Sequence, residues 1–474
     1  MTHLGETRNG LRVAGVNAGA ALASIALVLL CSGALFGCPS SVRVTVPDFT
    51  GLTLYEAMAE VESHGIEEVD VAAGEFSDAS PPGRVVRTEP AAGAEVVAVH
   101  SIKLFLSKGP EPTMEQPIAI ASVEDLQKIG RDAAYPLNAR YKLTANIDAS
   151  ATADWNNGAG FAPIGSGDVN NPTNAFYGKL EGNGRVITGL HINRPNASSV
   201  GLFGYLGPGA VVEKVHLVDG SVTGGADTGA LAGLADMAEV RRCTAEVDVA
   251  GTYGAGGLIG SAVLTQVTEC AAMGAVSGHG DVGGLVGDAF GGAIVRSCAD
   301  GPVAGTLIHT AAGGPFYGHV GGLVGANLSE VADCYALGSV IGSRGVGGLT
   351  GNTGRWTRLL AEGLTDKALW PATITVNASE ESFTTTGTVA RCYSAGLVQG
   401  LEHAGGLIGR SNSDTASASF WDVDTSGQAS SVGGVGKTTA DMKKQATYTG
   451  AGWDFANTWG IAAGQYPHLL WETP

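Results

Sequence analysis

Short apolar segments recur along the second half of the chain, and glycine bounds each of them. The segments GALAG, GGLIG, GGLVG, GGLVG, GGLTG and GGLIG centre on six leucines: Leu231, Leu258, Leu285, Leu323, Leu349 and Leu407. Successive leucines are 27, 27, 38, 26 and 58 residues apart, which indicates a unit of about 27 residues with two insertions. A repeat of this length predicts a solenoid, in which each unit buries its apolar face by stacking on its neighbours.

The pattern within each unit predicts short strands, because glycine interrupts every window long enough for a helix. We therefore expect a mainly β protein built as a parallel β-helix, with glycine supplying positive φ at the corners. We expect the leucines to point inward as a ladder. Five cysteines that follow the leucines are expected to form a second inward ladder: Cys243, Cys270, Cys298, Cys334 and Cys392. Buried free thiols are the expected state of these cysteines, and a disulfide between neighbours such as Cys243 and Cys270 is the alternative.

The core GGLVG and the phrases CYALGSVIG and CYSAGLVQG resemble the GLUG repeat over residues 200–415, with insertions near 303–319 and 352–385. Residues 118–199 resemble the coils that precede GLUG arrays, beginning with a short helix whose N-cap is Ser122. Residues 416–474 resemble the closing segment of such arrays. The resemblance implies a bacterial surface or adhesin-like protein and assigns no activity to the repeat.

The string GGVGKTT at residues 433–439 is similar to a nucleotide-binding P-loop. Ser431 stands where the first glycine of a P-loop is needed, and no buried apolar strand precedes the string. We expect a turn and a helix start instead, with Thr438 and Asp441 as a capping box, and therefore neither nucleotide binding nor ATPase activity. Four tryptophans are expected to cover the open last coil: Trp421, Trp453, Trp459 and Trp471.

Residues 46–109 have a different pattern. Thr53 and Glu56 predict a capping box for a helix with the apolar stripe Leu54, Ala57, Met58 and Val61, and Ile102, Leu104 and Leu106 predict one face of a strand. The VPDFTG start, the EA helix, the PAAG turn and the closing SKGP resemble a PASTA domain, a small α+β unit. The resemblance implies contact with peptidoglycan, and a spacer role is the alternative. Residues 110–117 form a proline-rich linker.

Residues 1–37 resemble a lipoprotein signal peptide, because Arg8 and Arg12 precede an apolar stretch that ends in LFGC. The resemblance implies that Cys38 carries a lipid and that residues 38–45 form a tether to the membrane. An uncleaved anchor and an ordinary secretory signal are the alternatives. All three place residues 39–474 outside the cytoplasm. In a cell with two membranes, the lipoprotein resemblance with Pro39 after the lipid cysteine implies the outer membrane or the cell surface.

Composition and charge exclude some functions. The net charge of −18 argues against a nucleic-acid partner. Neither H-E-x-x-H nor G-x-S-x-G occurs, and no spacing of Cys and His predicts a metal site or a cofactor. Five acidic residues that share no phase within the repeat are expected to be solvated: Asp148, Asp168, Asp219, Asp281 and Asp333. We therefore expect no catalytic residues.

The second insertion carries the best candidates for ligand contacts, Trp356, Arg358 and Trp370, because loops on a rigid scaffold often bind ligands. Folding back onto the rod is the alternative. The function expected from the whole sequence is a non-catalytic envelope lipoprotein. Its partners are expected to be the membrane, peptidoglycan and a glycan or surface protein. A carbohydrate-active β-helix lyase or hydrolase is the alternative.

Overall fold

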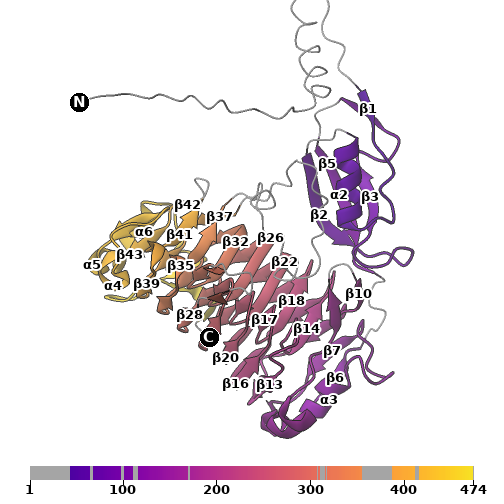
Figure 1. Ribbon diagram of the computed structural model, residues 1–474, viewed down its shortest axis with the longest axis horizontal. Helices are drawn as coiled ribbons and strands as arrows, with labels where there is room; N and C mark the ends of the chain where they lie inside the picture. Colours follow the sequence, from indigo (N-terminus) through magenta and orange to yellow (C-terminus); the bar gives the residue numbers. More distant parts are fainter. Residues whose placement is uncertain are drawn as a thin grey trace, which may run out of the picture.

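The computed structural model describes residues 43–64, 68–97, 101–109, 116–168, 171–306, 308–309, 315–316, 318–354, 387–411 and 416–472. These residues form a small α+β unit and a long stack of parallel strands. Figure 1 shows the small unit beside the first coils of the stack, which runs from the purple strands to the yellow carboxyl-terminal segment.

The small unit packs one helix, α2 (Leu54–Ser63), against a three-stranded sheet. The sheet has the order β2 (Glu68–Glu75), β5 (Ser101–Ser107), β3 (Val85–Glu89), and a second antiparallel pair joins β1 (Arg43–Thr45) to β4 (Glu95–Val97). The capping box is confirmed, since the Thr53 N–H donates to Glu56 Oε2 at 2.8 Å and the Glu56 N–H donates to Thr53 Oγ1 at 3.2 Å.

The core of the small unit follows the predicted apolar faces. Ile102, Leu104 and Leu106 are fully buried, and Ala57 and Val61 of the helix pack in the same cluster. The periodicity of this segment was therefore sufficient to identify the buried faces of its helix and of its last strand.

The long part of the chain is a parallel β-helix, as predicted, with three sheets along its sides. The first sheet contains the strands β6 (Ile118–Ile120), β7 (Arg140–Leu143), β11 (Lys179–Glu181), β14 (Phe203–Leu206), β15 (Val211–Glu213), β18 (Ala232–Asp236), β19 (Glu239–Arg241), β22 (Ile259–Thr268), β26 (Val286–Val295), β32 (Val324–Ala332), β36 (Thr350–Thr353), β37 (Thr388–Ala390), β41 (Ile408–Ser411) and β42 (Ala416–Ser417). The second contains β8 (Ile147–Asp148), β12 (Val186–Thr188), β13 (His191–Asn193), β16 (His216–Thr223), β20 (Thr244–Ala250), β23 (Ala271–Ala272), β24 (Val276–Gly278), β27 (Cys298–Ala299), β28 (Val303–Gly305), β33 (Tyr335–Ala336), β34 (Val340–Ile341), β38 (Tyr393–Ser394), β39 (Val398–Gln399), β43 (Phe420–Asp422) and β44 (Val435–Lys437). The third contains β17 (Thr228–Gly229), β21 (Ala255–Gly256), β25 (Val282–Gly283), β31 (Val320–Gly321), β35 (Arg344–Gly347) and β40 (Glu402–Gly405).

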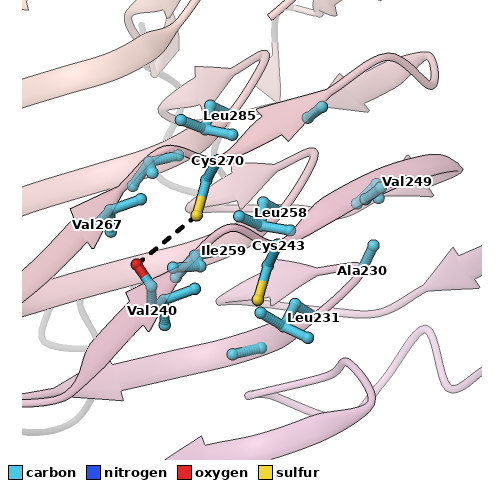
Figure 2. Packing of buried hydrophobic residues seen from close by; sticks show 14 of the residues in the cluster. Ala230, Leu231, Val240, Cys243, Val249, Leu258, Ile259, Val267, Cys270 and Leu285 are labelled. Atoms are coloured by element: carbon cyan, nitrogen blue, oxygen red, sulfur yellow. Dashed lines mark hydrogen bonds between the residues drawn. The ribbon is translucent and has the colours of Figure 1, made fainter. Parts of the chain in front are cut away.

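The six repeat leucines lie directly above one another inside the β-helix. Each is fully buried, and the N–H of each of the first five donates to the carbonyl oxygen of the next leucine along the stack at 2.8–2.9 Å. Figure 2 shows Leu231, Leu258 and Leu285 in this arrangement. One leucine per coil therefore fills the same interior position throughout the array.

The glycine pairs before these leucines are required by the close spacing of the coils. A Cβ at Gly257 would lie 2.2 Å from the carbonyl oxygen of Gly284, and one at Gly284 would lie 2.0 Å from that of Gly322. The corner before the cysteine ladder is instead turned by charged residues, including Arg242 (φ 52°) and Glu269 (φ 56°). The expectation that glycine supplies the positive φ was therefore wrong at this corner.

The amino-terminal end of the β-helix is covered by α3 (Val123–Lys128), whose buried Val123 and Leu126 join the main core. Ser122 caps this helix, as predicted, because its side chain accepts from the Asp125 N–H. The next coil includes the 3₁₀ segment η1 (Ser150–Gly158).

The carboxyl-terminal segment adds α4 (Val423–Ser426), α5 (Thr439–Met442), α6 (Gln445–Thr449), β45 (Trp459–Gly460), β46 (His468–Leu469) and η2 (Leu470–Glu472).

Candidate functional site

The residues predicted to carry lipid or ligand lie outside the described part of the chain. This applies to Cys38 and to Trp356, Arg358 and Trp370. The positions from which the second insertion leaves the rod are described. The strands β36 and β37 flank the insertion and both pair with β32, and the Gly387 N–H donates to the Gly354 carbonyl at 3.0 Å. The insertion therefore leaves and re-enters the coil at one point of an otherwise continuous strand path.

The inward ladder at the cysteine corner contains four cysteines and two buried serines, Ser297 and Ser419. Cys243, Cys270, Cys334 and Cys392 are buried in the main core, and the free thiols of Cys243 and Cys270 are visible in Figure 2. Burial raises the pKa of the Cys270 and Cys334 thiols.

Cys298 does not belong to this ladder, which corrects the sequence-based assignment. Ser297 takes the inward position, where it is fully buried. Its Oγ accepts the Cys270 N–H at 3.1 Å, and its own N–H donates to Cys334 Sγ at 3.4 Å. Because side chains alternate across a strand, Cys298 points to the outer face, in register with Ala271 and Tyr335.

The outer face at Cys298 is covered by the carboxyl-terminal segment. The outward column continues through Tyr335, Tyr393 and Phe420. These residues pack in one cluster with Met442, Tyr448, Trp453, Trp459 and Leu469. Two hydrogen bonds fix the end of the segment, from Tyr335 OH (2.9 Å) and Cys298 Sγ (3.1 Å) to Glu472 Oε1.

From the sequence, all four tryptophans were expected to cover the open last coil, and the structure shows that they do not. Trp421 does belong to the main core at that end. Trp453 and Trp459 are buried in the lateral cluster, and the indole N–H of Trp471 donates to the Arg296 carbonyl at 2.8 Å. Three of the four consequently pack along the side of the rod.

The P-loop-like string and the two serines shortly before it close the open end of the β-helix. Ser430 O accepts the Gly406 N–H at 3.0 Å, and Ser431 Oγ accepts the Ile408 N–H at 2.9 Å. Val435–Lys437 then forms β44, which pairs with β43. Thr438 caps α5, as predicted, by accepting the Asp441 N–H at 3.2 Å.

The acidic residues noted in the sequence lie in separate places. Asp333 forms a two-pronged ion pair with Arg391 at 2.7 and 2.8 Å, and Asp148 accepts the Ser150 N–H at 2.9 Å. Asp281 and Asp333 both differ from the solvated state that was expected, because Asp333 is paired with Arg391 and Asp281 contacts His319 at the end of the first insertion.

The small unit contacts the first coils of the β-helix. Met237 packs against the core of the small unit, and a Cβ at Gly83 would lie 3.7 Å from Pro208 Cγ. Met237 has φ 49°, a conformation that disfavours a non-glycine residue. The contact therefore uses a residue held in an unusual backbone conformation.

No helix within the described ranges is long and apolar enough to cross a membrane. Across the same ranges, no three or more His, Cys, Asp or Glu side chains are arranged as a metal-ligand set.

Family models match two parts of the chain. The PASTA domain model matches residues 44–108, and the GLUG motif model matches residues 316–341. The chain resembles PASTA-domain and GLUG-motif proteins. The small unit is thus the PASTA unit, and the β-helix carries the GLUG-type coils.

Two curated relatives match parts of the chain. Halomucin from Haloquadratum walsbyi is 43% identical over 141 residues, which is 29% of this chain and 2% of halomucin. A protein from Evansella cellulosilytica named "Putative Gly-rich membrane protein" is 44% identical over 88 residues, 17% of this chain and 10% of that protein. The chain thus matches only a small part of the length of each.

A solved structure from Bacteroides ovatus, titled a "putative immunoglobulin A1 protease", is 18% identical and covers 76% of this chain and 94% of that one. Its TM-score of 0.37 carries no argument about fold or activity.

The domains and the relatives' names together fit a cell-envelope or surface protein.

Proposed function

We propose that this chain is a non-catalytic lipoprotein of the cell envelope, in which the PASTA unit contacts peptidoglycan and the β-helix is a rod for adhesion or scaffolding. The observation that carries the proposal is the combination of a PASTA unit with GLUG-type coils in one chain. Met237 links the two parts, so that the rod would project from the wall in a defined direction.

Peptidoglycan contact is tested by cosedimentation of residues 39–474 with purified peptidoglycan. We expect the chain to pellet with the wall and a chain lacking residues 46–109 to remain in solution. The chain lacking residues 46–109 is the control. It should have little affinity for the wall, because the protein is acidic (net charge −18 for the whole chain). Equal pelleting of both chains would contradict the assignment to the PASTA unit.

Lipid attachment at Cys38 is tested by labelling cells with radioactive palmitate. Label should be lost in Cys38→Ala and retained in Cys31→Ala, which is the matched control in the same segment. Label that persists in Cys38→Ala would remove the anchor from the proposal.

Ligand contact by the second insertion is proposed for Trp356, Arg358 and Trp370, because loops on a rigid scaffold often bind ligands and two tryptophans can stack on the rings of a glycan. A glycan array probed with the parent chain and with a Trp356→Ala, Trp370→Ala double variant tests this. Loss of binding in the variant supports the contact, and depolymerisation of any polysaccharide by the parent would favour the enzyme alternative.

A further inference from the structure

One corner of the β-helix collects acidic residues from neighbouring coils. The residues that precede the aligned Thr228, Ala255, Val282 and Val320 are Asp227, Gly254, Asp281 and His319. Backbone hydrogen bonds connect them, including Ala255 N to Asp281 O at 3.0 Å and Val282 N to His319 O at 2.8 Å. The four positions therefore stack directly, and Asp288 of β26 joins them from the adjoining sheet.

Within the described ranges, His319 contacts only one of the three carboxylates, that of Asp281. Its Nδ1 lies 2.6 Å from Asp281 Oδ1, and its backbone N–H donates to the same oxygen at 2.8 Å. Although burial opposes ionisation, these contacts hold the pKa of Asp281 below its usual value. Asp281 is thus held by its two contacts with His319.

Asp227 and Asp288 point to a common place above Gly254. Asp288 Oδ2 and Asp227 Oδ1 lie 2.9 and 3.0 Å from the position that a Cβ of Gly254 would take, and the Gly260 carbonyl oxygen lies 3.6 Å from it. A side chain at residue 254 would therefore collide with both carboxylates, and Gly254 (φ 59°) allows the two oxygens to approach this point.

Neither carboxylate has a cationic partner among the described residues, although the Asp288 side chain shares a hydrogen bond with that of Asp281. Asp227 is only 5% exposed, and no described residue donates a hydrogen bond to its side chain. Asp288 Oδ1 is inaccessible to solvent and has no hydrogen-bond partner in the described part of the chain. Burial raises the pKa of both groups, to about 7 for Asp227. Buried charges are normally paired or bound to a cation, and an orphaned buried oxygen points to a missing ion or water.

We propose that Asp227 and Asp288 bind a calcium ion between them, beside Gly254. Calcium prefers carboxylate and carbonyl oxygens in an irregular shell completed by water, and two carboxylates with the Gly260 carbonyl supply such donors. The two acids belong to coils on either side of the coil that contains Gly254. A calcium ion here clamps three coils at the position from which the first insertion emerges, whether or not the PASTA unit contacts the wall.

Calorimetry and thermal unfolding of residues 39–474 at pH 7.5 test the site, with calcium chloride against EDTA in 0.1 M salt. We expect saturable binding of one calcium ion and a rise of several degrees in Tm. Asp288→Asn and Asp227→Asn should each weaken calcium affinity at least tenfold. Asp154→Asn, which removes an exposed carboxylate, is the matched control and should bind as the parent does.

The unfolding temperature of the Asn variants in EDTA shows whether they fold as the parent does. In EDTA, Asp288→Asn should unfold at the same temperature as the parent or higher, because it removes a buried uncompensated charge. The site would be overturned if calcium had no effect on the parent. It would also be overturned if calcium raised the Tm of the two Asn variants as much as that of the parent. Stability that ignores calcium but falls with rising pH, and loses that dependence in Asp288→Asn, would show that protons neutralise the pair and would also overturn it.

Discussion

A single residue decides the composition of the inward ladder at the cysteine corner. The spacing from leucine to ladder position is 12 residues at Cys243 and Cys270, and 12 residues beyond Leu285 is Ser297, whereas Cys298 lies one further on. The ladder side chains also act as acceptors, since Cys392 Sγ accepts the Cys334 N–H at 3.4 Å. Cys and Ser can therefore both fill this corner and accept a backbone N–H, whereas Val215 takes the equivalent position one coil before Cys243.

Substitution of Ser297 tests this role. Ser297→Ala leaves the buried Cys270 N–H without an acceptor and should lower the free energy of unfolding by about 1–3 kcal/mol. Ser297→Cys should stay within about 1 kcal/mol of the parent, because Sγ can accept the same bond. Guanidinium unfolding measures both, with exposed Ser277→Ala as control. Equal stability of the Ala and Cys variants would show that the hydrogen bond is unimportant.

A buried acid gives the protein a specific pH dependence. Burial raises the pKa of Asp236 to about 7, against a small opposing effect of the hydrogen bond from Tyr205 OH at 3.1 Å. An acid whose pKa is higher in the folded state makes stability fall as pH rises between its unfolded value near 4 and 7, by at most about 1.4 kcal/mol per pH unit. Asp236→Asn should flatten this part of the profile measured by thermal unfolding. An unchanged slope would mean that Asp236 is not the group responsible.

At the scale of elements, the closing segment is a lateral cover. The aromatic column Tyr335, Tyr393 and Phe420 faces outward, and without a cover it would expose a large apolar patch. Trp459 of the closing segment is buried in the cluster with this column, and its indole N–H donates to Asp333 Oδ1 at 3.3 Å. The tyrosine after each late repeat cysteine is therefore a docking residue for the carboxyl-terminal segment.

Removal of Trp459 should loosen this cover. Trp459→Ala deletes a fully buried side chain, and we expect a cost of about 3–5 kcal/mol to docking of the segment. Cys298 lies under the segment, so its labelling by maleimide at pH 8 should accelerate, whereas the four ladder cysteines should stay protected. Trp155→Ala, at the other end of the rod, is the control. Protection of Cys298 in Trp459→Ala would contradict a lateral cover.

At the scale of the whole molecule, the rod is continuous past its second insertion. The strands on both sides of the insertion pair with the same strand, and the Asp333–Arg391 ion pair bridges the coils across it. The stack therefore has the contacts it needs at this point without residues 355–386.

Replacement of residues 355–386 by a four-residue Gly-Ser loop should preserve the fold. The shorter loop lowers the entropic free-energy cost of closing the loop by about 2 kcal/mol. The free energy of unfolding should therefore be unchanged or slightly higher. A Gly-Ser segment of the original length is the matched control. A clear loss of stability in both chains would indicate that the insertion folds back onto the rod, which is the alternative to a ligand-binding loop.

The sequence by itself determined the repeating architecture and most of its interior. Period-two alternation, the spacing of the leucines and the capping residues Thr53 and Ser122 are local signals, so they predict strands, stacking and helix starts. Tertiary structure alone decided which face Cys298 takes, where the tryptophans pack and how Asp227 and Asp288 meet. A shift of one residue reverses the face of a strand. The contact between Cys298 and Glu472 joins positions 174 residues apart, and local pattern carries no information about such a pair.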